Sequence, residues 1–337
     1  MKILTNMILS ILMSIFPFYL SLSQVNQTSE TPNDLIITPG EVTITQIEYD
    51  GLTRDYRYYI PNNFDIEKKH PLILVLHGYN QPIETMVMTF EPAHPNADAD
   101  GTVIVYPVST GSMETMNLAW NTIYGNLGQT DQVDDIGYLT FLIDLFIEKL
   151  NCDPDRVYIT GTSMGGAMTY TLSCYIPDKL AAVAPVIMQT GINLIEQFQD
   201  AKPLPIMIIT GSADPLVPQS GLSGSQFAVA SMVDNIHYWK NRNGITATAV
   251  VSDLPNPCTE VTDSVETPSR IQKYVWESAE GNEIIWLNVI NGGHWLPIYV
   301  DGNPIDPSAF GINMGTWNCD FNGAAAIYEF LLSHKRQ

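Results

Sequence analysis

The chain has 337 residues, a formal net charge of −21 and 45% hydrophobic residues. Its 36 acidic side chains, against 15 basic ones, would repel a phosphate backbone, which argues against a nucleic-acid partner. A chain of this length and hydrophobicity buries a large core, and we expect one main domain kept soluble by an acidic surface.

The first residues are typical of a secretory signal. Lys2 is followed by an uncharged, largely apolar run through Leu22, and small residues precede Gln24. The run is interrupted by Pro17 and is shorter than the about 20 apolar residues of a spanning helix, so cleavage is favoured over a stable membrane anchor. We therefore expect residues 1–23 to be removed and the protein to be secreted, to the extracellular space or the periplasm.

We expect a flexible N-terminal segment at 24–40 and a single domain at 41–337. Near the start of that domain, apolar and polar residues alternate on both sides of Asp50-Gly51. This pair tolerates the positive φ angles of a type I′ turn, so the pattern predicts an antiparallel β-hairpin over 42–60.

The rest of the domain alternates apolar runs with amphipathic stretches. Buried strands are predicted at 71–76, 102–108, 157–159, 181–187, 205–209 and 284–290. Helices are predicted at 136–150, 167–175, 229–242 and 321–332. Because strands alternate with helices, we expect an α/β fold whose doubly wound, mostly parallel sheet follows the N-terminal hairpin.

The most informative segment is Gly161-Thr-Ser163-Met-Gly165, a G-x-S-x-G motif between a buried strand and an apolar helix. This context is that of a nucleophile elbow, which raises the serine hydroxyl above the carboxyl end of the sheet. The Met164 N–H then lies at a helix N-terminus and faces a developing oxyanion. The alternative is that Ser163 is only the N-cap of a tight strand-to-helix turn.

A serine nucleophile needs a base, and the base needs a carboxylate that fixes its tautomer. After a nucleophile elbow the acid comes first and the histidine second. Asp214 follows the buried strand at 205–209 in a loop fixed by Gly and Pro; the alternatives are an Asx-type turn there, or Asp253 as the acid. Among the six histidines, His294 follows a late apolar strand through Gly292-Gly293 and is the predicted base.

His77 and Gly78 end the first buried strand of the predicted parallel sheet. We interpret His77 as structural support for the loop that follows. The N–H of Tyr79 in that loop is the predicted second oxyanion donor, beside that of Met164.

Together these motifs resemble the secreted poly(3-hydroxybutyrate) depolymerase and feruloyl esterase group of α/β-hydrolases. The resemblance spans most of the chain after the signal and rests on Tyr-Arg-Tyr-Tyr-Ile-Pro (56–61), Leu-His-Gly (76–78), Ala-Trp-Asn (119–121), Val-Asp-Asp-Ile-Gly (133–137), the elbow segment (153–166), Gly-Ser-Ala-Asp-Pro-Leu-Val-Pro (211–218) and Gly-Gly-His-Trp-Leu-Pro (292–297). It implies a catalytic triad and a set of accessory residues, namely Ser163, Asp214 and His294 as the triad, oxyanion N–H groups at Tyr79 and Met164, and Trp120 and Trp295 beside the substrate cleft.

The chain departs from this group in its cysteines and in one loop. The group often carries a cysteine at the position of Tyr79 and another just before the position of Trp120, and this chain has neither. Residues 297–316 are also longer than the usual segment after the histidine. The acyl and alcohol groups of the substrate therefore do not follow from the resemblance.

All four cysteines follow the predicted signal, and an even number in an exported chain favours disulfides. Cys152 precedes the predicted nucleophile strand, and Cys174 lies about three turns along the next helix, so both are expected at the lower end of the sheet. We predict the pairs Cys152–Cys174 and Cys258–Cys319, the second clamping the loops that flank His294.

The predicted function is a secreted serine carboxylic-ester hydrolase that works through an acyl-enzyme on polymer-derived esters. These are hydroxyalkanoate polyesters or oligomers, or feruloyl and other acyl esters of polysaccharides, with soluble esters favoured over solid polyester. The alternatives are a serine peptidase of the same fold and, in a different class, a non-catalytic surface binding module. No zinc-ligand spacing, P-loop or dinucleotide motif is present, so no metal or other cofactor is expected, and oligomeric state is not indicated.

Overall fold

The computed structural model of the chain describes residues 35–112, 114–115, 117–122, 133–224, 227–256, 269–297, 299–300, 303–304 and 314–336. From Leu35 onward these residues belong to one compact unit. The predicted signal at 1–23 lies outside the described residues, so its removal stays a prediction.

The described strands are β1 (Val42–Tyr49), β2 (Leu52–Tyr59), β3 (His70–Leu76), β4 (Val103–Pro107), β5 (Cys152–Thr162), β6 (Ala182–Val186), β7 (Ile206–Gly211), β8 (Val250–Asp253), β9 (Arg270–Glu277), β10 (Glu283–Ile290), β11 (Tyr299–Val300) and β12 (Asn303–Pro304). The α-helices are α2 (Ile83–Phe90), α3 (His94–Asp100), α4 (Asp135–Leu150), α5 (Met164–Tyr175), α6 (Ile192–Gln197), α7 (Met232–Arg242) and α8 (Gly323–Leu332). Short 3-10 turns occur at η2 (Glu91–Ala93) and η3 (Pro177–Lys179).

The main sheet has the strand order β1-β2-β4-β3-β5-β6-β7-β10-β9-β8. Its central strands, from β4 to β10 in that order, are parallel. The hairpin β1-β2 joins this part antiparallel at one edge, which confirms the predicted α/β fold. At the other edge β9 and β8 are also antiparallel, a feature that the sequence did not predict because β8 is exposed along its whole length.

The hairpin turn has the geometry that its sequence predicts. Asp50 and Gly51 have φ angles of 51° and 75°, as a type I′ turn requires, and Tyr49 pairs with Leu52 across it. The turn therefore fixes the register of β1 against β2, which decides which β2 side chains face each side of the sheet.

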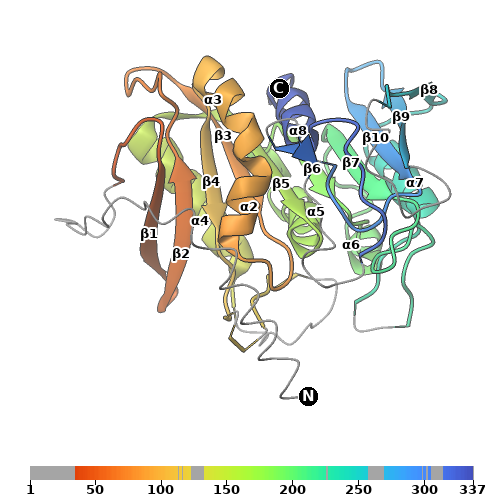
Figure 1. The fold of residues 1–337 in the computed structure, drawn as a ribbon, viewed down its shortest axis with the longest axis horizontal. Helices are drawn as coiled ribbons and strands as arrows, with labels where there is room; N and C mark the ends of the chain where they lie inside the picture. The colour runs from red at the N-terminus through yellow and green to blue at the C-terminus, as the bar shows by residue number, and fades with distance from the viewer. Residues whose placement is uncertain are drawn as a thin grey trace. The chain divides into compact units, whose positions relative to one another are not determined.

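Helices cover both faces of the parallel strands, because alternate strand residues point to opposite sides. On β3, Leu72, Leu74 and Leu76 join a core cluster with α4, α5 and α7, whereas Ile73 and Val75 join a second cluster with α2, α3 and α8. Figure 1 shows α2 and α5 on opposite faces of the strands. The sheet is thus buried on both sides, and only its edges and strand ends are open for a site.

Helix α4 begins and ends at local signals. The side chain of Asp134 accepts a hydrogen bond from the Gly137 N–H at 2.7 Å, which caps the N-terminus. Asn151 ends the helix with a left-handed φ of 51°. These caps fix α4 as the crossover between β4 and β5.

The folded unit begins earlier than residue 41. The Ile36 N–H donates to Tyr58 Oη at 2.8 Å, and the Gly40 N–H donates to the Ile60 carbonyl at 2.8 Å. The part of the predicted flexible segment at 35–40 is therefore attached to β2, while residues 24–34 lie outside the described residues.

The predicted Cys152–Cys174 disulfide is wrong, since both cysteines are free and buried. Helix α5 directs Cys174 toward α7, where its Sγ lies 3.8 Å from Tyr238 Oη and 4.0 Å from Arg242 Nη1. Cys319 is disulfide-bonded, but Cys258 lies outside the described residues, so the predicted Cys258–Cys319 pair stays a prediction.

Within the described part of the chain, no helix combines the length and apolarity needed to cross a membrane. In the same residues, no group of three or more His, Cys, Asp and Glu side chains is arranged to hold a metal ion. The expected absence of a membrane anchor and of a metal remains a prediction for the whole chain.

Candidate active site

Ser163 lies in the sharp turn between β5 and α5, with φ 53° and ψ −114°. A positive φ is strained for a residue with a side chain, and such strain persists only where neighbouring structure holds it. Here the Ser163 N–H donates to the Val186 carbonyl at 2.9 Å, and its own carbonyl accepts from the Ala167 N–H at 3.0 Å. The half-buried hydroxyl is thereby held at the carboxyl end of the sheet.

The two glycines of the motif allow the turn to pack against the end of β3. A Cβ on Gly161 would lie 2.6 Å from the Gly165 carbonyl carbon. A Cβ on Gly165 would lie 2.1 Å from the Leu76 carbonyl oxygen. Any larger residue would push the nucleophile turn away from the loop that follows β3.

His294 and Asp214 are in direct contact, with 2.6 Å between Nδ1 and Oδ2, and they are only 3% and 5% exposed. The other carboxylate oxygen of Asp214 accepts the N–H groups of Leu216 at 2.8 Å and Val217 at 2.9 Å. The contact with Asp214 Oδ2 places a proton on Nδ1 and leaves Nε2 of the imidazole as the basic nitrogen. The reserve acid, Asp253, is exposed on edge strand β8 beside Arg270.

Hydrogen bonds donated by backbone N–H groups fix the loops that carry the acid and the histidine. The Ala213 N–H donates to the Gly292 carbonyl at 2.9 Å, and the Asn291 N–H donates to Ser212 Oγ at 2.9 Å. The His294 N–H donates to the Met314 carbonyl at 2.6 Å. Because β7 and β10 are parallel neighbours, these bonds hold the carboxylate and the imidazole in register.

The structure brings Asp214 and His294 together and puts Ser163 at the same edge of the sheet, where β5, β7 and β10 end. In the described part of the chain, no hydrogen bond joins Ser163 to His294. Catalytic hydrogen bonds are often long without substrate and tighten when it binds, so the arrangement remains compatible with a triad.

The loop after β3 lies against the nucleophile turn. A Cβ on Gly78 would lie 3.4 Å from Ser163 Cβ. The Gly78 N–H donates to Gln81 Oε1 at 2.7 Å, and the same oxygen accepts the Thr162 hydroxyl at 3.0 Å. Gln81, which no sequence motif indicates, therefore ties this loop to the turn and positions the following N–H group, that of Tyr79.

The helix end of the turn offers the other predicted oxyanion donor. Met164 is the first residue of α5, so its N–H has no partner within the helix. Among the described residues, no acceptor outside the helix takes it either. The positive end of the α5 dipole adds to its attraction for an anion.

His77 supports residues 77–80, named the oxyanion loop because Tyr79 is the predicted oxyanion donor, as its sequence position predicts. Its Nε2 accepts the Ser109 N–H at 3.0 Å, and its Nδ1 donates to the Gly78 carbonyl at 2.7 Å. Burial lowers the pKa of His77 to about 4, although the hydrogen bond to Gly78 opposes this. The imidazole is thus neutral at pH 7, as one accepting and one donating nitrogen require.

The predicted position of Trp120 beside the cleft is corrected by the structure. Its side chain is 1% exposed, and its indole N–H donates to the His77 carbonyl at 2.9 Å. Trp120 therefore supports the oxyanion loop instead of contacting substrate. Trp295 is half-buried next to His294, and its indole N–H points to the Gly315 carbonyl at 3.3 Å, so its contact with substrate stays a prediction.

A second buried histidine, His94, is expected to lower the stability of the fold at acidic pH. Burial lowers the pKa of His94 to about 4, against a smaller opposing effect of Asp98. An unfolded histidine takes up its proton near pH 6.5, so stability falls as the pH drops from about 6.5 to about 4. The loss is roughly 3 kcal/mol at most for each such histidine.

We expect His94→Phe to lose less stability than the parent between pH 7 and pH 4.5. Phenylalanine keeps the ring that stacks on Tyr59, 3.9 Å between centroids, but has no proton to gain. Urea unfolding at both pH values measures the difference, with exposed His237→Phe as the matched control. Equal acid losses in His94→Phe and the parent would contradict this account.

The sheet order, the strained serine after β5, and the acid and histidine after β7 and β10 define an α/β-hydrolase fold. The solved structure of an acetyl xylan esterase from Aspergillus awamori has the same fold, with a TM-score of 0.55 and 15% identity, covering 81% of this chain and 99% of its own. No family model matches the chain.

Among curated proteins, the chain is 28% identical over 208 residues to a bifunctional acetylxylan esterase/xylanase from Neocallimastix patriciarum, covering 59% of this chain and 28% of that protein. It is 26% identical over 245 residues to feruloyl esterase B from Piromyces equi, covering 69% and 41%. It is 34% identical over 122 residues to a poly(3-hydroxybutyrate) depolymerase from Ralstonia pickettii, covering 34% and 24%. The matches thus span less than half the length of each relative, and they confirm the resemblance predicted from the motifs.

Proposed function

We propose that the chain is a secreted serine carboxylic-ester hydrolase, with Ser163 as nucleophile, His294 as general base and Asp214 as the acid that orients it. The observation that carries the proposal is the 2.6 Å contact between Asp214 and His294 at the sheet edge where the strained Ser163 lies. The apolar, uncharged run after Lys2 supports secretion.

The proposed reaction forms and then hydrolyses an acyl-enzyme. Ser163 Oγ attacks the ester carbonyl carbon while His294 Nε2 takes the hydroxyl proton. The oxyanion that forms accepts the N–H groups of Tyr79 and Met164. The intermediate then collapses, the bond to the alcohol oxygen breaks, and the imidazolium gives its proton to the leaving alcohol.

Deacylation repeats these steps with water as the nucleophile. His294 takes a proton from water as the oxygen attacks the acyl carbon, and it returns the proton to Ser163 Oγ as the carboxylic acid leaves. The negative charge of Asp214 stabilises the imidazolium in both halves of the reaction. Two backbone N–H groups hold its second oxygen and keep the carboxylate in place. No cofactor enters this scheme.

We propose short acyl and feruloyl esters of polysaccharides as the first substrate class, and hydroxyalkanoate oligomers as the second. The relatives named as acetylxylan and feruloyl esterases support the first class, and the depolymerase supports the second. Tyr79 and Leu216, 44% and 47% exposed, present apolar surface next to the proposed oxyanion donor and acid. Such surface suits an acyl or aryl group.

We expect p-nitrophenyl acetate and feruloyl esters to turn over faster than crystalline poly(3-hydroxybutyrate) or long-chain triglycerides. Hydrolysis of a soluble ester needs only the triad and the oxyanion donors. A polymer chain in a crystalline solid must first detach from its neighbours before its ester group can enter the site. Initial rates on this panel measure the ranking. Rapid clearing of the crystalline polyester with negligible activity on soluble esters would reverse it and leave the triad unaffected.

Two further assays test the alternatives. Cleavage of peptide anilides, without ester hydrolysis, would favour a serine peptidase of the same fold. A fluorophosphonate is expected to label the parent but not Ser163→Ala, because it reacts with an activated serine. A parent that takes up no label would favour a non-catalytic binding module.

A further inference from the structure

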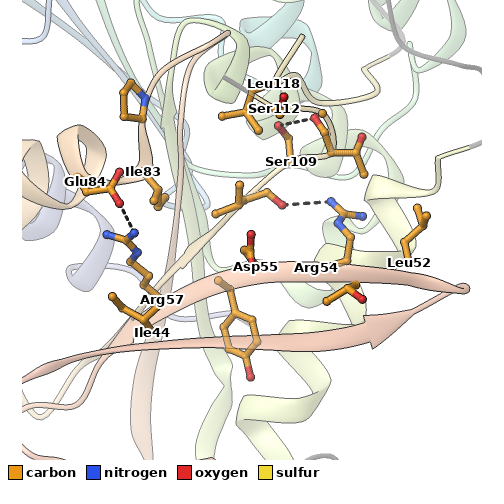
Figure 2. Close-up of a pocket in the computed structure, with 16 residues that line it drawn as sticks. Ile44, Leu52, Arg54, Asp55, Arg57, Ile83, Glu84, Ser109, Ser112 and Leu118 are labelled. Atoms are coloured by element: carbon orange, nitrogen blue, oxygen red, sulfur yellow. Dashed lines mark hydrogen bonds and ion pairs between the residues drawn. The ribbon is translucent and has the colours of Figure 1, made fainter. Parts of the chain in front are cut away.

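A groove of about 590 Å³ lies on the side of the N-terminal hairpin that faces α2. Figure 2 shows its floor on β2, with Asp55 and Arg57, and its opposite wall at Ser109, Ser112 and Leu118. The first residues of α2 close one end. The proposed triad does not line this groove, so it is a separate feature of the molecule.

The groove floor is a row of polar side chains in cross-strand pairs. Asp55 faces Gln46, whose amide donates to the carboxylate at 2.6 Å. Thr53 faces Glu48 and donates its hydroxyl to that carboxylate. Thr53 and Asp55 are exposed, so hydrogen-bonding groups spaced along a strand are presented to whatever occupies the groove.

Most charges of the groove are already paired. Its lining contains Arg54, Arg57, Asp55 and Glu84. Arg54 is buried and ion-paired with Asp135 outside the groove, so Asp55 is the carboxylate of the lining that has no cationic partner among the described residues. Arg57 points to Glu84 on α2 and is ion-paired with it, as Figure 2 shows. Ile44 and Leu52, 53% and 41% exposed, add aliphatic surface at the rim. One carboxylate without a cationic partner, several hydroxyl side chains and short aliphatic patches suit an uncharged ligand rich in hydroxyl groups, which can donate hydrogen bonds to that carboxylate.

Hydrogen bonds connect the groove wall to the loop over the proposed nucleophile. Ser109 donates its N–H to the His77 imidazole at 3.0 Å. The Asn80 N–H donates to the Leu118 carbonyl at 2.9 Å, and the Leu118 N–H donates to Asn80 Oδ1 at 2.8 Å. The groove wall is therefore joined to the 77–80 loop, and this loop packs against Ser163 at Gly78.

We propose that this groove binds the main chain of a neutral polysaccharide whose ester group occupies the site at Ser163. The inference rests on the proposed esterase function, and it adds a polymer subsite on the N-terminal hairpin. A cavity of about 590 Å³ lies within the range of about 300–1,000 Å³ that ligand pockets occupy, enough for a short run of sugar rings. The hairpin would then raise affinity for the polymer without taking part in the chemistry.

Asp55→Leu and Thr53→Leu test this subsite, because each replaces a hydrogen-bonding side chain by a branched side chain that cannot hydrogen-bond. Ser252→Leu is the matched control, an equally exposed position on β8 at the other edge of the sheet. Affinity gel electrophoresis of each variant, in the inactive Ser163→Ala background, measures binding to unesterified arabinoxylan, a neutral polymer. In active enzyme, KM and kcat are measured on acetylated xylan and on p-nitrophenyl acetate.

We expect Asp55→Leu and Thr53→Leu to weaken retardation by arabinoxylan at least fivefold and to raise KM for acetylated xylan by a similar factor. Their kcat/KM for p-nitrophenyl acetate should match the parent, which also shows that they fold, and Ser252→Leu should match the parent throughout. The subsite proposal would be overturned if arabinoxylan did not slow the migration of the parent in the gel. It would also be overturned if the groove variants were slowed as much as the parent. A parent that does not hydrolyse p-nitrophenyl acetate would instead overturn the esterase proposal. The two outcomes are distinguishable, because retardation by arabinoxylan measures binding and needs no catalysis.

Discussion

Ser163→Ala and His294→Ala are each expected to lower kcat for ester hydrolysis by about 10⁴ to 10⁶-fold, because triad members act as a unit. Without the serine there is no acyl-enzyme, and without the imidazole nothing takes the hydroxyl proton at neutral pH. Steady-state kinetics on p-nitrophenyl acetate measure the loss. Circular dichroism should show that both variants remain folded, so that the lost activity is not a loss of structure.

The choice of acid is tested in the same assay. Asp214→Asn is expected to lower kcat by about 10⁴-fold, because an amide that donates to Nδ1 would favour the wrong imidazole tautomer. Asp253→Asn is the matched control and should keep parental activity, since this carboxylate is exposed beside Arg270 and Gln272. A severe loss in Asp253→Asn with an active Asp214→Asn would show that the acid is wrongly assigned.

The part of the site that could be predicted from sequence is the part that local signals determine. Gly161 and Gly165 mark a turn that no larger residue fits, and Asp214 and His294 each follow a buried strand that ends in a tight loop. Because parallel strands end at one edge of a sheet, the sequence alone is enough to predict that these loops lie near each other.

Features that depend on side-chain direction could not be predicted. Aromatic residues are common beside substrate clefts, which favours that position for Trp120, yet its N–H is used by the His77 carbonyl. Cys174 lies at the predicted end of α5, but the helix turns its thiol toward α7. Gln81 belongs to no motif, and only its two hydrogen bonds indicate that it positions the oxyanion loop.

The largest expected effect on stability concerns a buried ion pair between the hairpin and α4. Arg54 Nη2 lies 2.6 Å from Asp135 Oδ1, with the two side chains 2% and 0% exposed. The guanidinium also lies 3.8 Å from the centre of the Tyr138 ring, and the second Asp135 oxygen accepts the Asn121 N–H at 2.7 Å. The pair thus joins β2, the start of α4 and Asn121. Asn121 directly follows Trp120, whose indole supports the oxyanion loop.

We expect Arg54→Met to lower the free energy of unfolding by about 3–5 kcal/mol at pH 7, because it leaves a buried carboxylate without its partner. Urea unfolding measures the loss. Arg57→Met on the same strand is the matched control and should cost less than about 1 kcal/mol, since its partner Glu84 is half exposed to solvent. Arg54→Met/Asp135→Asn should recover part of the loss, because a neutral amide oxygen still accepts the Asn121 N–H.

The deficit of Arg54→Met, meaning its loss of unfolding free energy relative to the parent, is expected to shrink as the pH falls from 8 to 5. Burial already raises the pKa of Asp135 despite the opposing charge of Arg54, and removing that charge raises it further. A carboxyl whose folded pKa lies above its unfolded value binds its proton more tightly when folded, so lower pH favours the folded variant. The acid loss at His94 occurs in parent and variant alike and cancels in the difference. The charge of Arg54 also lowers the pKa of His77, so its removal lessens the acid loss at His77 and shrinks the deficit in the same direction. A deficit that stays constant over this range would mean that the cost comes from lost packing on Tyr138, with no contribution from an unpaired carboxylate.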